Sequence, residues 1–446
     1  MNESLPDRRL TRRRLLGGLA VTGTALSASV AAGVGGGSSL QESPGAMRWS
    51  ETYDRTAQDV ECNAISAVDG GYYLAGSVGF PGGTRHGWVQ RVDETGAPEW
   101  EFVDNRPGDE APLYSVVTEP NGGCLAGGDV TTHLTDETNA TALSLDSDGA
   151  LNWGSEYARS WHVSANAATR VDDGYVLAGH ARSYSTQGTK IILVSIDDEG
   201  EQRWLRTFGG SATVNICYDM VPVDGGYLLA GSTDREDDSQ VLLARTDENG
   251  EIDWEELYDI EGAYSLAHGV VPTDDGGYLL GGRTGDSSHI FRAVVVKTDG
   301  DGVEQWRWVN DVESACHDLV VRPDGGCVLA GRRLDKGWLA AINADGDLIA
   351  SESYSGEGRG SFGSLLSVDD GYITAGQTFE FDETQSQGWL VSAGRLAESG
   401  ADPIDTEYSL AEQDDDSLPG FSAIGSVVGI STAYALSRRF GTTDDD

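Results

Sequence analysis

The segment Asp224-Gly225-Gly226-Tyr227-Leu228-Leu229-Ala230-Gly231 is the most informative part of the sequence, because close copies of it recur along most of the chain. Its first half is a turn, in which Gly supplies the positive φ that tight β connections need. Its second half is a short apolar strand. Seven copies of this strand, with final glycines 45 to 52 residues apart, stand at residues 72–76, 124–127, 175–179, 227–231, 278–282, 327–331 and 372–376.

Each repeat has room for four strands. Around the quoted stretch we expect them at residues 217–223, 227–231, 240–246 and 252–258, with a second turn at 247–250. Four-stranded units that repeat about every 50 residues are typical of the blades of a β-propeller. The sequence therefore predicts an all-β fold, a seven-bladed β-propeller of four-stranded blades that spans residues 47–396.

A tryptophan marks the outer strand of most repeats, and its position predicts how the propeller closes. The seventh repeat ends after its third strand, at residues 388–396, and has no outer strand of its own. Trp49-Ser50-Glu51-Thr52-Tyr53-Asp54, before the first repeat, matches Trp254-Glu255-Glu256-Leu257-Tyr258-Asp259. We therefore expect this N-terminal segment to supply the missing outer strand, because closure removes exposed sheet edges. The other outer-strand tryptophans are Trp100, Trp153, Trp204 and Trp306, with Ser351 in the sixth repeat.

The charge of the chain excludes one class of partner. Its 446 residues carry 30 Lys and Arg against 73 Asp and Glu, a formal net charge of −43. Such a chain does not bind nucleic acid or anionic membranes through bulk charge. A dense acidic surface suits concentrated salt, where counterions screen its self-repulsion, so the sequence indicates a halophilic protein.

The N-terminal segment fits a twin-arginine signal peptide. Thr11-Arg12-Arg13-Arg14-Leu15-Leu16 has the arginine pair followed by apolar residues, and the weakly apolar run 15–32 supplies the hydrophobic region. We expect residues 1–32 to be a signal peptide for the twin-arginine translocase and 33–46 to be a linker. An amphipathic basic start to a cytosolic protein is the alternative.

The C-terminal segment resembles the PGF-CTERM sorting signal of archaeal surface proteins. An acidic stalk at 397–417 leads into Pro419-Gly420-Phe421, an apolar run at 422–436 and the pair Arg438-Arg439, within a sorting segment at 418–446. The resemblance implies recognition by an archaeosortase, removal of the helix and attachment to a membrane lipid. The apolar run is shorter than the ~20 residues of a stable span. The expected location is the cell surface, anchored to the cytoplasmic membrane or envelope through the C-terminus, and a retained helix is the alternative.

Polar residues that differ between repeats gather at one level of the inner strands. Inner strands and loops of a propeller converge on a central opening, where ligands bind. His268, His317, Asp219 and Asp318 could also hold a metal, but no paired motif accompanies them, so we predict no metal site. Ordinary hydrogen bonding between blades is the alternative that we weigh most heavily. The binding candidates at this channel mouth are Asn63, Tyr114, Asn166, Tyr218, Asp219, His268, His317 and Asp318, with Gly363 at the same level in the last repeat.

The turns between third and fourth strands raise the question of a cofactor. Asp146-Ser147-Asp148-Gly149 and Asp299-Gly300-Asp301-Gly302 look like the start of a calcium loop, but no distant acidic ligand follows, so we expect plain turns. The spacing Asp-x-x-Gly-x-x-x-Trp is similar to the tryptophan-docking motif of quinoprotein dehydrogenases, which implies tryptophan-locked blades. The adjacent cysteine pair of those enzymes is absent, so we expect no pyrroloquinoline quinone (PQQ) and predict no cofactor, with calcium at these turns as the alternative. The repeats also resemble a group of exported microbial repeat proteins without an assigned activity.

The cysteines and one sequon complete the candidate sites. An odd number of cysteines, at positions 62, 124, 217, 316 and 327, leaves at least one free thiol. Cys62, Cys217 and Cys316 belong to blades that are not neighbours, which places them too far apart for disulfides. Asn139-Ala140-Thr141 is a glycosylation candidate that we expect in a loop of the second blade.

Two functions of different class remain open. The first is a non-catalytic binding or interaction module for a glycan, a peptide or an envelope protein, favoured because no nucleophile–base pair or carboxylate pair is recognisable. The second is an extracellular hydrolase or lyase with its site over the central channel, using His268, His317, Asp219 and Asp318. Propellers host many activities, so the fold does not choose between them.

Overall fold

The computed structural model describes residues 13–14 and 44–396, apart from 56–57, 80–82, 107–109, 133–136, 159–161, 183–187, 210–213, 236–237, 263, 287, 289, 356–357 and 381–384. The predicted stalk and sorting segment, with Pro419, Gly420 and Phe421, lie outside the described residues, as does the predicted signal peptide except for Arg13 and Arg14. In the described part of the chain, no helix is long and apolar enough to cross a membrane.

The described residues form antiparallel groups of four strands, which we call blades and name by their inner strand. The blades are β3 (Asp59–Val68), β4 (Gly71–Gly79), β5 (Arg85–Asp93) and β6 (Pro98–Val103); β7 (Leu113–Thr118), β8 (Cys124–Thr132), β9 (Glu137–Leu145) and β10 (Leu151–Tyr157); β11 (His162–Val171), β12 (Gly174–Arg182), β13 (Thr189–Ile196) and β14 (Gln202–Phe208); β15 (Asn215–Val223), β16 (Gly226–Arg235), β17 (Asp238–Asp247) and β18 (Ile252–Tyr258); β19 (Tyr264–Pro272), β20 (Tyr278–Gly285), β21 (Phe291–Thr298) and β22 (Glu304–Val309); β23 (Ser314–Val321), β24 (Cys327–Arg333), β25 (Lys336–Ile342) and β26 (Leu348–Tyr354); and β27 (Gly358–Val368), β28 (Gly371–Glu380) and β29 (Ser386–Gly394) with β2 (Met47–Tyr53).

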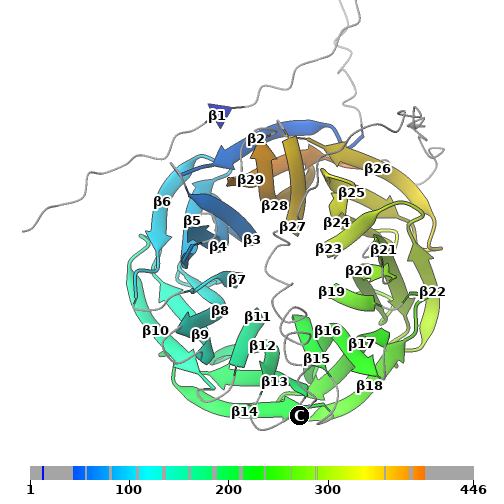
Figure 1. Cartoon of the computed structure of the whole chain (residues 1–446), viewed down its shortest axis with the longest axis horizontal. Helices are drawn as coiled ribbons and strands as arrows, with labels where there is room; N and C mark the ends of the chain where they lie inside the picture. Colours follow the sequence, from blue (N-terminus) through cyan, green and yellow to red (C-terminus); the bar gives the residue numbers. More distant parts are fainter. Residues whose placement is uncertain are drawn as a thin grey trace, which may run out of the picture.

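The blades stand around a common centre, as Figure 1 shows. Each inner strand contacts the inner strand of the next blade, in the order β3, β7, β11, β15, β19, β23, β27, and β27 contacts β3 again. A single parallel pair, Ser239 with Tyr264, also joins the β15 and β19 blades. The fold is therefore all-β and of the propeller type, and several strands extend a few residues beyond the predicted ends.

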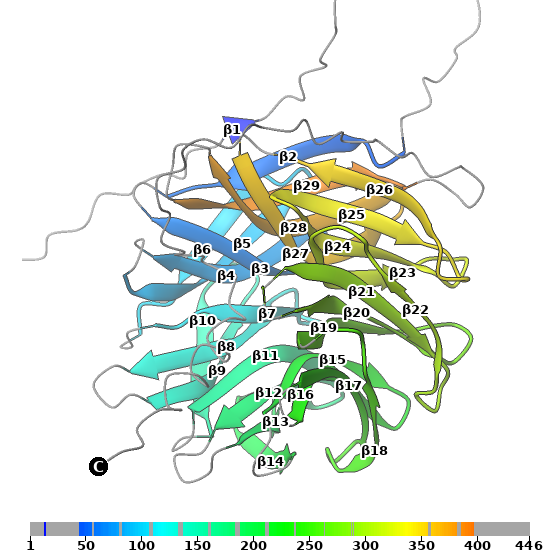
Figure 2. The ribbon, with the colours of Figure 1, turned by 45° about the vertical axis from the view of Figure 1, so that its right-hand side comes forward.

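The two ends of the described chain meet in one blade. Strand β2 pairs antiparallel with β29, with Trp49 opposite Ser392, and Figures 1 and 2 show the blue and orange strands side by side. The amide of Gly45 donates to the carbonyl oxygen of Arg395 (2.9 Å), and Gly45 accepts the Tyr354 hydroxyl (2.6 Å). In other blades a turn glycine between the third and fourth strands makes these contacts. Here no turn connects β29 to β2, and Gly45, which precedes β2, takes the place of that glycine. On the outer edge of β2 lies the short strand β1 (Arg13–Arg14).

The apolar core lies between neighbouring blades. Every residue of β4 and of β29 is buried, because the second and third strands are covered on both faces, whereas β6 is partly exposed along its whole length. One cluster joins Leu193 of the β11 blade to Cys217 and Leu229 of the β15 blade. Continuous apolar strands of this kind are expected where both faces of a sheet are buried. All five cysteines are buried free thiols, in agreement with the prediction that at least one is free.

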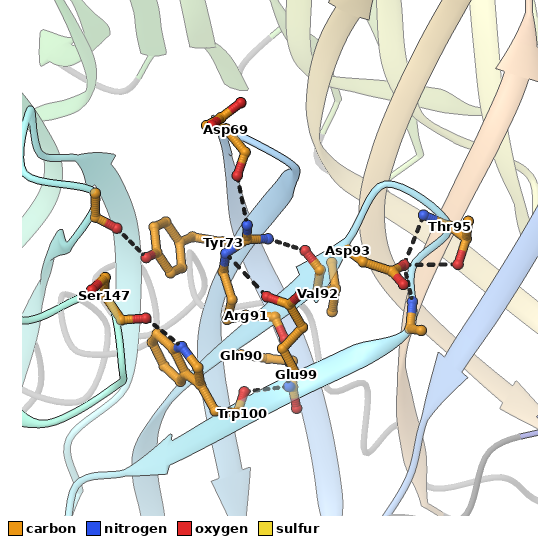
Figure 3. Close-up of polar contacts among 12 residues, drawn as sticks. Asp69, Tyr73, Gln90, Arg91, Val92, Asp93, Thr95, Glu99, Trp100 and Ser147 are labelled. Atoms are coloured by element: carbon orange, nitrogen blue, oxygen red, sulfur yellow. Dashed lines mark hydrogen bonds and ion pairs between the residues drawn. The ribbon is translucent and has the colours of Figure 1, made fainter.

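We call the outer strands and the turns between third and fourth strands the rim. There the tryptophan of one blade packs on the turn glycine of the next: a Cβ on Gly149 would lie 2.7 Å from the Trp100 ring. The Trp100 indole also donates to the carbonyl oxygen of Ser147 (2.9 Å), as Figure 3 shows. Equivalent glycine contacts join Trp49 to Gly96, Trp153 to Gly200, Trp204 to Gly250, Trp254 to Gly302 and Trp306 to Gly346. The tryptophan locking that the sequence resemblance implies is therefore present.

The rim turns use their acidic residues internally. Asp146 Oδ1 accepts the amides of Asp148 (3.0 Å) and Ala150 (2.8 Å), and Asp299 Oδ1 accepts those of Asp301 and Val303. Figure 3 shows the same arrangement at Asp93, which accepts two backbone amides and the Thr95 hydroxyl. Such bonds account for Asp at the start of these turns without a bound cation.

The placement of the predicted glycosylation site was wrong. Asn139 lies within strand β9, not in a loop, and only 7% of its surface is exposed. Its side-chain amide donates to Glu156 Oε2 (3.0 Å). The sequence signal could not separate a strand from a loop here, because a three-residue motif carries no information on burial. The folded protein does not present Asn139 as an acceptor for a glycan.

Candidate functional site

The candidate residues on the inner strands share a backbone feature that the sequence did not reveal. Apart from Asp219 and Asp318, which directly follow a bulge, each is the extra residue of a β-bulge, where the register against the second strand shifts by one. Bulges of this kind re-aim a side chain and often accompany functional sites. The bulge residues are Asn63, Tyr114, Asn166, Tyr218, His268, His317 and Gly363.

The bulge explains the final glycine of every repeat. A Cβ on Gly231 would lie 1.9 Å from the carbonyl oxygen of Ile216, because the bulged inner strand brings that carbonyl against the second strand. The same contact identifies Gly128, not the predicted Gly127, as the equivalent glycine of the second repeat, where a Cβ would lie 2.1 Å from the Pro112 oxygen. In the other repeats this glycine stands five residues after the last turn glycine, and Gly128 stands five residues after Gly123, so the spacing in the sequence was the signal that could have identified it.

Three bulge residues bridge neighbouring blades. The Asn63 amide donates to the carbonyl oxygen of Leu113 (2.8 Å), and the Asn166 amide donates to that of Cys217 (2.6 Å). His317 Nδ1 lies 2.7 Å from the carbonyl oxygen of Phe362. Because a carbonyl oxygen only accepts, His317 carries its proton on Nδ1. These three side chains therefore form hydrogen bonds between blades, as expected under the alternative to ligand binding that the sequence left open.

Asp219 and Asp318 also bridge blades. Asp219 accepts the amides of Met220 (2.8 Å) and Val270 (2.9 Å), one on each oxygen. Asp318 accepts those of Leu319 and Leu365, both at 2.7 Å. Burial raises the pKa of Asp219 to about 6 and that of Asp318 to about 7, and the nearby charge of Asp219 adds to the shift of Asp318.

An aromatic row continues from these bridges along three blades. The rings of Tyr218 and His268 lie 5.3 Å apart, and those of His268 and His317 lie 5.3 Å apart in an edge-to-face arrangement. Burial lowers the pKa of His268 well below its usual value, with Arg283 and His317 adding to the shift, and lowers that of His317 to about 4. Both imidazoles are therefore neutral near pH 7.

Sequence reasoning missed a second set of polar side chains. They follow the bulge glycine on each second strand, and the changing polar residue after a repeated glycine was the signal that could have identified them. Together with the bulge residues they form what we call the centre of the molecule. The set is Ser77, Asp129, His180, Ser232, Arg283, Arg332 and Gln377.

The centre is not uniform in charge. On one side, burial raises the pKa of Asp129 to about 7, and its Oδ2 accepts the Ser164 hydroxyl (3.1 Å). On the other side, Arg283 and Arg332 lie near the two neutral histidines. Among the described residues, no group of three or more His, Cys, Asp or Glu could hold a metal ion. The arrangement suits recognition of polar or charged groups more than metal chemistry.

No family model and no curated protein matches the chain. Among solved structures, the polysaccharide lyase Uly1 is 12% identical, with a TM-score of 0.50, over 75% of this chain and 90% of that one. Sqt1 from Chaetomium thermophilum is 13% identical with a TM-score of 0.44, over 76% and 95% of the two chains. BBS1N, in a complex with ARL6DN, is 10% identical with a TM-score of 0.44, over 77% and 94%. At these identities the likeness to Uly1 shows the fold alone, a β-propeller.

Proposed function

We propose that this protein is a non-catalytic binding module that holds its ligand at the centre of a seven-bladed β-propeller. The single observation that carries the proposal is that two buried side-chain nitrogens at the centre have no hydrogen-bond partner in the described part of the chain, whereas the two bridging carboxylates there are fully hydrogen-bonded. His268 Nε2 and Arg283 Nε are buried without a hydrogen-bond partner among the described residues. Buried polar groups in folded proteins nearly always have partners, so unpaired ones at one place favour a ligand.

The bridging carboxylates support binding over catalysis. General acid–base work needs a carboxyl group that is free to reach a substrate proton. Both oxygens of Asp219, and both of Asp318, accept backbone amides instead. The proposed hydrolase or lyase activity has no comparable support, since the likeness to a polysaccharide lyase extends only to the fold.

The seven-bladed count and closure by β2 are part of this proposal. They are supported by the pairing of β2 with β29, and by Trp49 and Tyr53, which contact Gly96 of the β3 blade as their equivalents contact the next blade elsewhere. A closed ring holds the inner strands at fixed mutual positions, which a site built from several blades requires.

The binding proposal is tested with point variants and a ligand panel. The full chain is expressed from its first residue, and the exported protein is screened by thermal shift against neutral and acidic sugars and short peptides. We expect a hit whose shift is reduced by His268→Gln at the centre and unaffected by Tyr258→Phe at the rim. A hit that responds only to rim variants would move the site away from the centre.

We also propose export and anchoring at the cell surface. The support is the sequence alone, in Arg12 and Arg13 near the start and Pro419-Gly420-Phe421 near the end. The proposed processing partners are the twin-arginine translocase and an archaeosortase, with a surface glycan, peptide or protein as the bound partner and no nucleic acid. Mass spectrometry of envelope-extracted protein tests it: peptides from residues 424–438 in the mature species would show that the helix stays.

We also propose that the protein is adapted to concentrated salt, because its formal net charge is −43. The Debye length grows from about 3 Å at 1 M salt to about 30 Å at 0.01 M, which restores repulsion between surface carboxylates. We expect the melting temperature to fall as salt is withdrawn. A melting temperature that is the same at both concentrations would contradict the proposal.

A further inference from the structure

Arg283 stands out among the arginines of this acidic chain. It lies on β20 directly after the bulge glycine Gly282, and its guanidinium packs over the Phe291 ring at 4.4 Å. Its Nε atom is buried without a hydrogen-bond partner, and no carboxylate of the described residues contributes to the electrostatics of its guanidinium. Acidic residues outnumber Lys and Arg by 73 to 30. Arg283 is half-buried as a residue, but its Nε is shielded from water without a partner and the guanidinium has no counter-charge in the described part of the chain, an arrangement that is costly and favours a bound anion.

The neighbouring side chains leave that charge uncompensated. Arg332 is near Arg283 but shares its own charge with Glu313, at 3.4 Å. The closest imidazoles, those of His268 and His317, are neutral near pH 7, since burial and the arginines lower the pKa of both. The two groups whose charges act on Arg283, the Tyr218 phenol and the Arg332 guanidinium, therefore supply no negative charge near pH 7, which favours an anionic ligand.

The donors match the shape of a carboxylate. A guanidinium offers a planar fork of N–H groups that pairs with the two oxygens of a carboxylate. His268 is 7% exposed, and its unpaired Nε2 supplies one more donor when it carries the ring proton. The Tyr218 ring, 5.3 Å from His268, offers a flat face for the rest of the ligand.

We infer that Arg283, assisted by His268, binds the carboxylate group of a small organic anion at the centre of the propeller. This inference rests on the proposed binding function and adds the chemical class of the ligand. Arg283 is the charge partner, His268 an additional donor and Tyr218 the face against which the remainder of the ligand lies.

The test uses isothermal titration calorimetry on the full chain, at constant ionic strength maintained with sodium sulfate. The probes are D-glucuronate, D-glucose, which lacks the carboxylate, and chloride. We expect glucuronate to bind and glucose and chloride to bind at least tenfold more weakly. Arg283→Gln should weaken glucuronate binding by tenfold or more, since it removes the charge-assisted hydrogen bonds to the carboxylate. Arg283→Lys, which keeps the charge and loses the fork, should have a smaller effect.

A matched control is Arg206→Gln, which removes the same charge from outer strand β14, where Arg206 pairs with Glu251 at 2.7 Å. It should leave glucuronate binding unchanged. If Arg283→Gln melts far below the parent, Arg283→Lys decides alone. Equal binding of glucose and glucuronate, or binding of chloride only, would overturn the inference while leaving a binding site at the centre. A panel hit indifferent to His268→Gln would instead overturn the proposed function.

Discussion

The rim and the centre are built from the same repeats but differ in how their contacts vary. At the rim the same contact recurs: Tyr157 donates to the carbonyl oxygen of Gly200 and Tyr258 to that of Gly302, as Trp153 and Trp254 pack on the same two glycines. At the centre the bulge residue changes from Asn to Tyr to His, and the residue after the bulge glycine from Ser to Asp to Arg. A side-chain contact that recurs in each blade stabilises the fold. Side chains that differ between blades while the backbone stays the same indicate a binding site.

Removal of one rim strand should have the largest effect and tests whether the repeated rim contacts hold the fold together. A chain that lacks residues 47–54 loses β2, and with it the contacts of Trp49 and Tyr53 with the β3 blade. We expect loss of most of the stability and a tendency to aggregate, because β29 becomes an open edge. Thermal unfolding and light scattering measure both. A truncated protein that melts like the parent would refute closure by this segment.

Two glycines of one hairpin separate packing from backbone strain. In Gly231→Ala the new Cβ would lie 1.9 Å from the Ile216 oxygen, so the bulge must be rebuilt, and we expect a loss of about 3 kcal/mol or more. Gly225 has φ +75 but nothing within 4 Å, so Gly225→Ala should cost only about 1 kcal/mol. Urea unfolding compares the two. Equal losses would mean that the bulge does not dictate the glycine.

The centre should also reveal itself through pH. The folded pKa of Asp318, about 7, lies above its usual 3.8, so its contribution to stability is complete below pH 4 and is lost as the pH rises to 7. The folded pKa of His317, about 4, lies below its usual 6.5, so its contribution is present above pH 6.5 and lost as the pH falls to 4.

Two substitutions should therefore tilt the pH profile in opposite directions. Relative to the parent, Asp318→Asn should gain stability from pH 4 to 7, and His317→Gln should lose it from pH 4 to 6.5, each by about 1–3 kcal/mol. Unfolding free energies at several pH values test this. Two variants with slopes parallel to the parent would show that neither group titrates differently on folding.

The smallest effect is expected from a single rim hydrogen bond. Tyr258→Phe removes the donor to the Gly302 carbonyl oxygen, a 2.6 Å bond, and should cost about 1 kcal/mol without altering ligand binding. Its melting temperature and its affinity for any panel hit check the two parts. A loss of affinity from this variant would connect the rim to the site and weaken the distinction.

The repeat, the strand types and the level of the inner strand at which polar residues vary were all predictable from the residue pattern. These follow from short-range rules: glycine marks turns, apolar runs of about five residues mark buried strands, and a period near 50 residues marks a four-stranded unit. The outer-strand tryptophans were recognisable for the same reason, since each stands a fixed distance after its turn glycine.

The roles of the variable residues depend on contacts between strands and blades that are far apart in the sequence. The bulge at Tyr218 and the burial of Asn139 depend on the strand that lies opposite, which local sequence does not encode. Asp219 and Val270, 51 residues apart, share a hydrogen bond only because the β15 and β19 blades are neighbours. The same holds for Arg283. That no carboxylate of the described residues pairs with it follows from which side chains the fold places around it, and its position in the sequence does not reveal this.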